Sequence, residues 1–269
     1  MNSNAGTPGN KEKSNITKSI RDFFIDMYLV ARFIKRIFRE SFRIPFEFNE
    51  IIRQCYTIGV NSLPIISLTS FIIGFVFTKQ SRPSLVEFGA TSWLPSLVSI
   101  AIVRALAPLI TALILAGKVG SNMGAELASM RVTEQIDAME VSSTNPFKFL
   151  VVTRVIAITL MLPLLVSYSA IIALAGGYLN IHHVELTSYK TFLQNGFSQI
   201  TFLDLTSSFT KSIFYGFTIG VTGCFKGYHA DMGTVGVGKA ANSAVVISMF
   251  LIFLEELIIV QVINYFRFL

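Results

Sequence analysis

Four charged residues lie within or near apolar runs that are long enough to cross a membrane: Arg104, Lys211, Glu255 and Glu256. A charge at such a position costs on the order of 3 kcal/mol, so these side chains should face a cavity, a partner helix or each other. They could form a polar lining for a lipid headgroup, or an ion pair that latches one state of a transporter. A static salt bridge between helices explains them equally well.

A second group of charges occupies a short polar stretch between two apolar runs. Glu134, Asp137 and Glu140 must lie in water, because unpaired charge is costly in hydrocarbon. Val132, Ile136 and Met139 recur at i, i+4 and i+7, which predicts a short amphipathic helix with one apolar and one acidic side. Asn145-Pro146 should end this helix, since the residue before a proline is disfavoured in the α region.

Small residues mark the faces on which helices should approach each other. Ala116, Gly120, Gly124 and Ala128 recur every fourth residue, and Gly216, Gly220 and Gly223 form a similar face later in the chain. Both patterns favour close helix packing.

Composition defines the broad class. The chain has 269 residues, of which 52% are hydrophobic and 14% charged, with a mean hydropathy of +0.60. Soluble domains carry about 25% charged residues, so this composition predicts an integral membrane protein. The net charge of +6 does not indicate nucleic-acid binding, because the basic residues concentrate near the N-terminus beside the apolar runs, as positive-inside topology requires.

The N-terminal part divides into a polar tail, residues 1–19, expected to be disordered, and an amphipathic segment, residues 20–48. In this segment, apolar residues fall on one helical face and basic residues on the other. The apolar set is Phe23, Met27, Val30, Ile34, Ile37 and Phe38, and the basic set is Arg21, Arg32, Lys35, Arg36, Arg39 and Arg43. We expect this helix to lie in the membrane surface and to end by Pro45; packing on a protein partner is the alternative.

The remainder, residues 49–269, is predicted to be an all-α transmembrane domain with about five spans. We expect the spans at about 56–78, 92–117, 149–178, 205–225 and 241–265, with the second kinked at Pro95 or Pro108. With the amphipathic helix on the cytoplasmic side, the acidic stretch is cytoplasmic and residues 180–204 lie outside. Lys79 and Arg82 then fall on the external side.

The run AGKVGSNMGAELASMRVTEQIDAMEV (116–141), followed by NPFKFLVVTRVIA (145–157), resembles the signature of MlaE-type permeases, the membrane subunits of ABC transporters that move lipids with MCE-domain proteins. The resemblance implies a coupling helix at about 130–142 that docks on a separate ATPase. Its expected contact residues are Glu134, Gln135, Ile136, Asp137, Met139 and Glu140. It also implies a homodimer with a lipid cavity at the dimer interface, and an MCE-domain partner on the far side. ATP and magnesium would bind the ATPase, so this subunit needs no cofactor and is not an enzyme.

One position departs from the family pattern. Where the family has an R-E-L-G-P-like stretch, this chain has Arg104-Ala105-Leu106-Ala107-Pro108, so the carboxylate is missing. Glu255 or Glu256 could supply a substitute. Arg104, Lys211 and Glu256 are candidates for headgroup contact or gating, and Leu68, Phe71 and Phe75 for contact with lipid tails, since Phe71 and Phe75 are one helical turn apart.

Two other functions remain open from the sequence. A solitary secondary transporter or channel would explain the buried charges but not the acidic amphipathic helix. A membrane enzyme of lipid metabolism would need clustered catalytic or metal-binding residues. The adjacent His182 and His183 are a poor metal pair, and GTVGVGK (233–239) lacks phosphate-loop spacing. We expect a bacterial inner membrane location, with the plastid inner envelope as the alternative.

Overall fold

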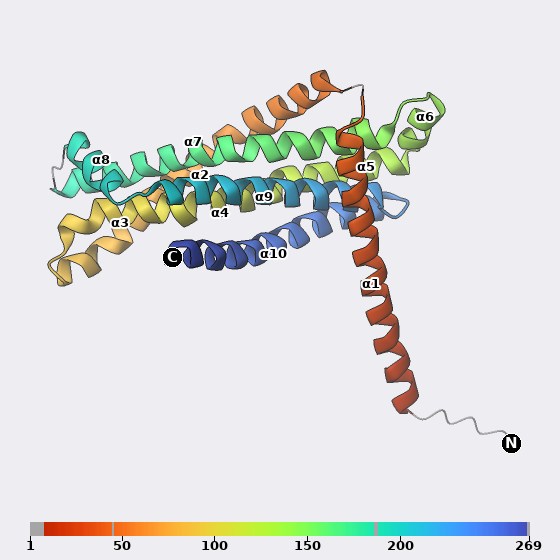
Figure 1. Ribbon diagram of the computed structural model, residues 1–269, viewed down its shortest axis with the longest axis horizontal. Coiled ribbons are helices and arrows are strands. Elements are labelled where there is room, and N and C mark those ends of the chain that lie inside the picture. Colours follow the sequence, from red (N-terminus) through yellow and green to blue (C-terminus); the bar gives the residue numbers. More distant parts are fainter. Residues whose placement is uncertain (1–7, 45, 186–187, 268–269) are drawn as a thin grey trace. The chain divides into compact units, whose positions relative to one another are not determined.

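The computed structural model describes residues 8–44, 46–185 and 188–267, and over these residues the chain is helical with no strand (Figure 1). The chain forms two compact units, Met1–Phe46 and Glu47–Leu269.

The first unit contains one helix, α1 (Pro8–Ser41). It begins inside the segment predicted to be a disordered tail, whereas residues 1–7 lie outside the described residues. The predicted amphipathic helix is therefore part of a longer one. It ends at Ser41, whose hydroxyl donates to the Ile37 carbonyl at 2.8 Å, and the predicted stop at Pro45 lies outside the described residues. Its placement in the membrane surface stays a prediction.

The second unit is a bundle of long helices. Its elements are α2 (Phe48–Glu87), η1 (Thr91–Trp93), α3 (Leu94–Ala101), η2 (Ile102–Leu106), α4 (Ala107–Leu115), η3 (Ala116–Gly120), α5 (Ser121–Val132), α6 (Gln135–Val141), η4 (Phe147–Val152), α7 (Thr153–Glu185), α8 (Tyr189–Ser198), α9 (Phe202–Tyr228) and α10 (Thr234–Arg267). In Figure 1 the short helix α6 lies at one end of the bundle, and α8 and the start of α3 lie at the other.

Four helical stretches of the described chain are long and apolar enough to cross a membrane: Phe48–Glu87, Thr91–Val132, Phe147–His183 and Thr234–Tyr265. They contain four of the five predicted spans. The fifth, α9, has 27 residues and is long enough to cross. It is absent from this set because it is too polar. Many of its polar side chains are buried inside the bundle, so they need no contact with lipid.

Small residues bring the helices of the bundle together as the sequence predicts. α2 packs along α7, and α9 packs against α5, α7 and α10. A Cβ on Gly216 would lie 2.9 Å from the Ile158 carbonyl oxygen, and one on Gly227 would lie 2.7 Å from the Gly124 carbonyl oxygen. Because backbone atoms occupy this space, no larger side chain fits without moving a helix.

Two π-helical turns, η2 and η3, interrupt the second span. The first lies immediately before Ala107 and Pro108. Proline has no N–H to donate to the carbonyl four residues earlier, which here belongs to Arg104. That carbonyl accepts a hydrogen bond from Lys211 Nζ at 3.2 Å instead. Irregular turns of this kind are frequent at functional sites, and this one positions Arg104.

Candidate functional site

A row of polar side chains runs along α9, which we call the polar stripe: Asp204, Lys211, Tyr215, Thr218 and Thr222. They recur at intervals of three, four or seven residues, so they share one face of the helix. Lys211 is 1% exposed and Tyr215 is 0% exposed. The partners of the stripe come from α10 and from η2. Inside a membrane bundle, the hydrogen-bonding groups of such polar side chains must be paired with other protein groups.

The centre of the stripe is an ion pair between Lys211 and Glu256, with Nζ 2.6 Å from Oε1. The hydroxyl of Tyr215 donates to the other oxygen of Glu256. Both carboxylate oxygens are therefore occupied, and the ammonium also donates to the Arg104 carbonyl. The sequence indicated Lys211 and Glu256 as candidates. The structure brings these two residues together although they lie 45 positions apart in the chain, on α9 and α10.

Glu255 lies next to this pair but faces different partners. Its Oε1 accepts a hydrogen bond from the Thr218 hydroxyl. Its Oε2 is buried and has no hydrogen-bond partner in the described chain. Leaving a buried acceptor unsatisfied costs about 1–3 kcal/mol. This carboxylate is therefore the least satisfied group of the site.

Arg104 binds a carboxylate that the sequence analysis did not name. Its Nη2 lies 3.0 Å from Oδ1 of Asp204, which also accepts from Arg267 at the end of α10. Asp204, and not Glu255 or Glu256, is the partner of the Arg104 side chain, and whether either glutamate substitutes for the missing family glutamate stays a prediction.

A sequence signal for Asp204 was available. Thr201 and Asp204 form a capping box at the start of α9, in which the Thr201 N–H donates to Asp204 Oδ2 at 3.1 Å. The spacing of a hydroxyl residue and an acidic residue three positions later is the usual mark of a helix start. Because residues 180–204 were expected to form an external loop, the capping pattern at Asp204 was not recognised.

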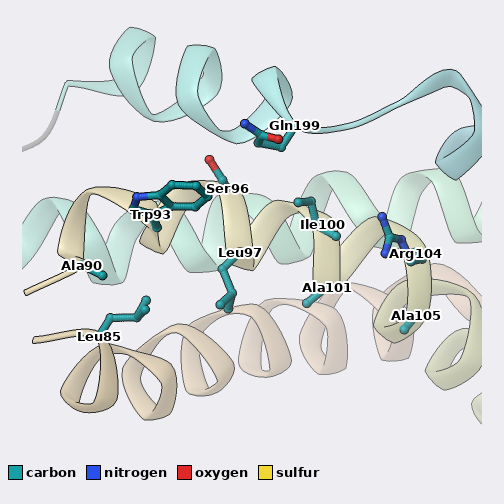
Figure 2. Close-up of a pocket in the computed structure, with 10 residues that line it drawn as sticks. All are labelled: Leu85, Ala90, Trp93, Ser96, Leu97, Ile100, Ala101, Arg104, Ala105 and Gln199. Carbon is teal, nitrogen blue, oxygen red and sulfur yellow. The ribbon is translucent and has the colours of Figure 1, made fainter. Parts of the chain in front are cut away.

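A cavity of about 580 Å³ lies beside Arg104 (Figure 2). It is lined by Leu85, Ala90, Trp93, Ser96, Leu97, Ile100, Ala101, Arg104, Ala105 and Gln199. Arg104 is the one charged residue of this lining, and Figure 2 shows it at the opposite end from Trp93. Ala105 stands where the family pattern has a glutamate, so a methyl group replaces a carboxylate in the wall. An elongated apolar hollow with one cation fits an amphiphile with an anionic group.

The residues expected to contact lipid tails lie on α2. Leu68 is 63% exposed and Phe71 is 37% exposed, and Phe75 is half-buried. The rings of Phe71 and Phe75 stack with their centroids 6.4 Å apart, as their one-turn spacing predicts. Their exposure leaves an apolar surface available to lipid or to another chain.

The predicted coupling helix is α6, which is shorter than the expected 130–142. Ile136 is 4% exposed and Met139 is half-buried, so the apolar side of α6 faces its own chain. The expectation that Ile136 contacts another protein is therefore corrected. Its buried side chain instead anchors α6 to its own chain. The exposed residues of the expected contact set are Glu134, Gln135, Asp137 and Glu140.

The hairpin that carries α6 is firmly braced. Glu126 on α5 bonds Arg154 on α7 at 2.8 Å, and Arg131 donates to the Tyr228 carbonyl at 2.8 Å. Residues with left-handed backbone flank α6, Glu134 with φ of 59° and Ser143 with φ of 61°. Such conformations persist only where surrounding structure holds them.

The end of α9 also contacts this hairpin through Tyr228, whose ring lies edge-on to Phe147 at 5.7 Å. Burial, and the neighbouring charges of Arg131 and Lys226, lower the pKa of His229. This imidazole is therefore neutral at pH 7 and adds no charge to the region.

A helical bundle with long apolar stretches and a braced surface helix has the features of a transporter's membrane subunit. The chain matches the MlaE permease family over residues 51–262, and it belongs to that family.

Three relatives are similar over most of their length. A probable ABC transporter permease protein of Rickettsia prowazekii is 38% identical over 218 residues, which cover 81% of this chain and 84% of that protein. One from Synechocystis is 36% identical over 208 residues, covering 76% and 78%. One from the red alga Pyropia yezoensis is 35% identical over 224 residues, covering 82% of each chain.

These comparisons define the chain as the permease subunit of an ABC transporter and as an integral membrane protein, with homologues in bacteria and red algae. Such a subunit typically lacks ATPase activity and works with a separate ATPase. A solitary transporter or channel, and a lipid-modifying enzyme, are set aside by this membership.

Proposed function

We propose that this permease moves lipids, most directly lipids with an anionic headgroup. The observation that carries this proposal is the cavity beside Arg104, which is apolar except for one cation. An acyl chain would lie along Leu97 and Ile100, and the headgroup phosphate would reach Arg104. Asp204 holds the guanidinium in place without lining the cavity itself.

We propose that α6 transmits motion from the ATPase. Its outward face is acidic and its inward face is anchored by Ile136, so a push on the outer face would be passed to α5. From α5, the Glu126–Arg154 pair leads to α7 and the Arg131–Tyr228 contact leads to α9. α9 carries the polar stripe. In this mechanism the Lys211–Glu256 pair latches one state of the bundle.

The proposed partners are an ATPase at α6, a second copy of this chain, and an MCE-domain protein on the opposite side of the membrane. The apolar window of α2 is 22% buried and that of α10 is 17% buried, against 67% for the third apolar stretch. These open faces support a homodimer that encloses lipid near Leu68 and Phe71. We place the complex in a bacterial cytoplasmic membrane, with the plastid inner envelope as the alternative.

Co-purification tests the proposal. The exposed acids of α6 are reversed in Asp137→Lys with Glu140→Lys, which leaves the Ile136 anchor intact. The matched control is Glu87→Lys, an exposed acid at the other end of the bundle. The wild type and the control should retain an ATPase after gentle solubilisation, and the double variant should lose it. Retention by the double variant would reject α6 as the docking site.

Lipid identity is tested on the same material by mass spectrometry of the lipids that co-purify. Anionic lipids should be enriched relative to the surrounding membrane in the wild type, and Arg104→Gln should remove the enrichment. Equal lipid profiles in the two proteins would contradict the headgroup assignment without affecting the result for α6.

A further inference from the structure

Glu255 on α10 is an acidic residue near the middle of a span, and no residue of the described chain forms an ion pair with it. Its Oε1 accepts a hydrogen bond from the Thr218 hydroxyl, whereas its Oε2 is buried and has no hydrogen-bond partner among the described residues. Thr218 lies about 24 Å along the axis of α9 from its start and about 15 Å from its end. Both ends of the bundle, where water is available, are therefore distant from Glu255.

The cation of the polar stripe is already committed to the neighbouring acid. Lys211 Nζ lies 2.6 Å from Oε1 of Glu256 and also donates to the Arg104 carbonyl at 3.2 Å. Tyr215 donates to the other oxygen of Glu256. Thr218, which marks the height of Glu255, is about 10 Å along α9 from Lys211. An ionised Glu255 would consequently give this contact one uncompensated negative charge.

The other elements packed against α10 hold their charges in different contacts. These elements are α4, η3, α5 and α9, and α4 contains no titratable residue. Lys118 in η3 donates to the Asn61 carbonyl on α2, and Glu126 on α5 bonds Arg154 on α7. Charges nearer the helix ends are engaged as well: Arg131 with the Tyr228 carbonyl, Lys226 with the Phe225 ring, Lys239 with Asp231, and Arg267 with Asp204. Each of these groups has a partner other than Glu255.

The surroundings of Glu255 decide which form of its side chain fits. The residue is half-buried, and its exposed part lies at membrane depth, where lipid supplies neither water nor a cation. An isolated carboxylate is far more costly in such a place than a neutral polar group. A neutral carboxylic acid keeps the hydrogen bond from Thr218, because its carbonyl oxygen accepts as well as a carboxylate oxygen does.

We propose that Glu255 is a proton-binding site, which holds one proton while α9 and α10 are packed together and releases it to water when their contact opens. Release leaves a carboxylate on Glu255 and transfers the proton to water, and closure reverses the step. The exchange rests on the proposed Lys211–Glu256 latch, whereas the bound proton itself depends only on the fold of this chain. Opening of the latch thereby becomes a proton-releasing step of the transport cycle.

Infrared spectroscopy of the full-length protein in detergent at pH 7 tests whether the proton is bound. A protonated carboxyl group absorbs at a higher frequency than a carboxylate, so the wild type should show a protonated-carboxyl band that Glu255→Gln lacks. The isosteric Thr218→Val removes the hydrogen bond to Oε1, so the band should remain and move to higher frequency. Glu87→Gln, which changes an exposed acid on α2, is the matched control and should keep the band unchanged.

A second measurement tests the exchange. The protein is reconstituted with its ATPase in weak buffer with a pH-indicator dye, and a non-hydrolysable ATP analogue is added so that hydrolysis contributes no protons. The wild type should release about one proton per chain more than Glu255→Gln does. This arm fails if the ATPase coupling proposed above is wrong, but the infrared arm does not.

The possible contrary results have distinct meanings. A wild type without a protonated-carboxyl band would overturn the proposal, because Glu255 would then be ionised and paired with a cation from a second copy of the chain. Persistence of the band in Glu255→Gln, or an unmoved band in Thr218→Val, would assign it to another acid and also overturn the proposal. The expected bands with equal proton release by both proteins would overturn the exchange and leave a bound proton of structural importance only.

Discussion

Helices α2 and α9 differ in the side chains that they expose and in those that they bury. Both are long enough to cross a bilayer, and both pack on α7. α2 is apolar and leaves side chains such as Leu68 exposed, whereas α9 is polar and buries Lys211 and Tyr215. Hydropathy therefore detects α2 and misses α9. The helix that hydropathy misses is the one that carries the candidate site.

The difference shows how a membrane bundle can hold a charged centre. Lipid contact is left to the apolar helices and to the apolar outer face of α9, where Phe209 and Phe214 are exposed, and protein covers the polar face of α9. Each side chain of the polar stripe then needs a protein partner at the correct height on α10 or η2, because lipid offers no hydrogen-bonding group. Substitutions on α9 should consequently affect stability far more than substitutions on α2.

Removing the Lys211 charge should produce the largest effect. Lys211→Met leaves the half-buried Glu256, whose side chain is 17% exposed, without its cation, which should lower the free energy of unfolding by about 3 kcal/mol. Denaturation of the purified protein in mixed micelles measures this change. The matched substitution on α2, Lys79→Met, should change it by less than about 0.5 kcal/mol because Lys79 is exposed.

The double variant Lys211→Met with Glu256→Met separates two contributions to the free energy of unfolding. One is the destabilisation caused by leaving a single charge unpaired, and the other is the net stabilisation by the intact ion pair. Replacing both partners with apolar side chains should restore most of the stability. A double variant as unstable as the single variant would mean that the pair itself holds the bundle together.

The glycine face of α9 should give the next largest effect. In Gly216→Ala the new Cβ would lie 2.9 Å from the Ile158 carbonyl oxygen and from Thr159 Cα. Overpacking against backbone should cost about 1–3 kcal/mol in the same unfolding measurement. Gly238→Ala on α10, where nothing lies within 4 Å, should instead be neutral or stabilising. Equal losses in both variants would refute the packing argument.

The exposed residues of α2 should show the smallest effect on stability and a measurable one on transport. Leu68→Ala with Phe71→Ala should change the free energy of unfolding by about 0.5 kcal/mol or less. If these residues line a lipid cavity, ATP-dependent lipid transfer should slow on the order of tenfold. Leu160→Ala on α7, with 57% exposure, is the control and should transfer lipid normally. Normal transfer by the α2 variant would remove these residues from the substrate path.

The sequence predicted the parts of the fold that have a local signal. The apolar spans, the glycine faces and the helix at Gln135–Val141 follow from period and composition. It also identified Lys211 and Glu256 as charges that need a partner. It could not pair them, because residues 45 positions apart are brought together only by the crossing of α9 and α10.

Two features needed three-dimensional information. Periodicity showed that Ile136 and Met139 share a face of α6, but not that this face turns inward, since an apolar face can meet its own chain or a partner equally well. Asp204 looked like a loop residue because the start of α9 is polar. Its role depends on Arg104 and Arg267, which arrive from two distant segments.

The most direct test of the account is ATP-dependent lipid transfer by Arg104→Gln, reconstituted with the ATPase in vesicles that contain an anionic lipid. Asp204 keeps Arg267 as a partner in this variant, so the fold and ATPase binding should be retained. The matched control is Arg267→Gln, which removes the other cation of Asp204 from outside the cavity. We predict that transfer falls about tenfold or more in Arg104→Gln and stays near the wild-type rate in Arg267→Gln. Wild-type transfer by Arg104→Gln, or an equal loss in both variants, would contradict a role for Arg104 in holding the lipid.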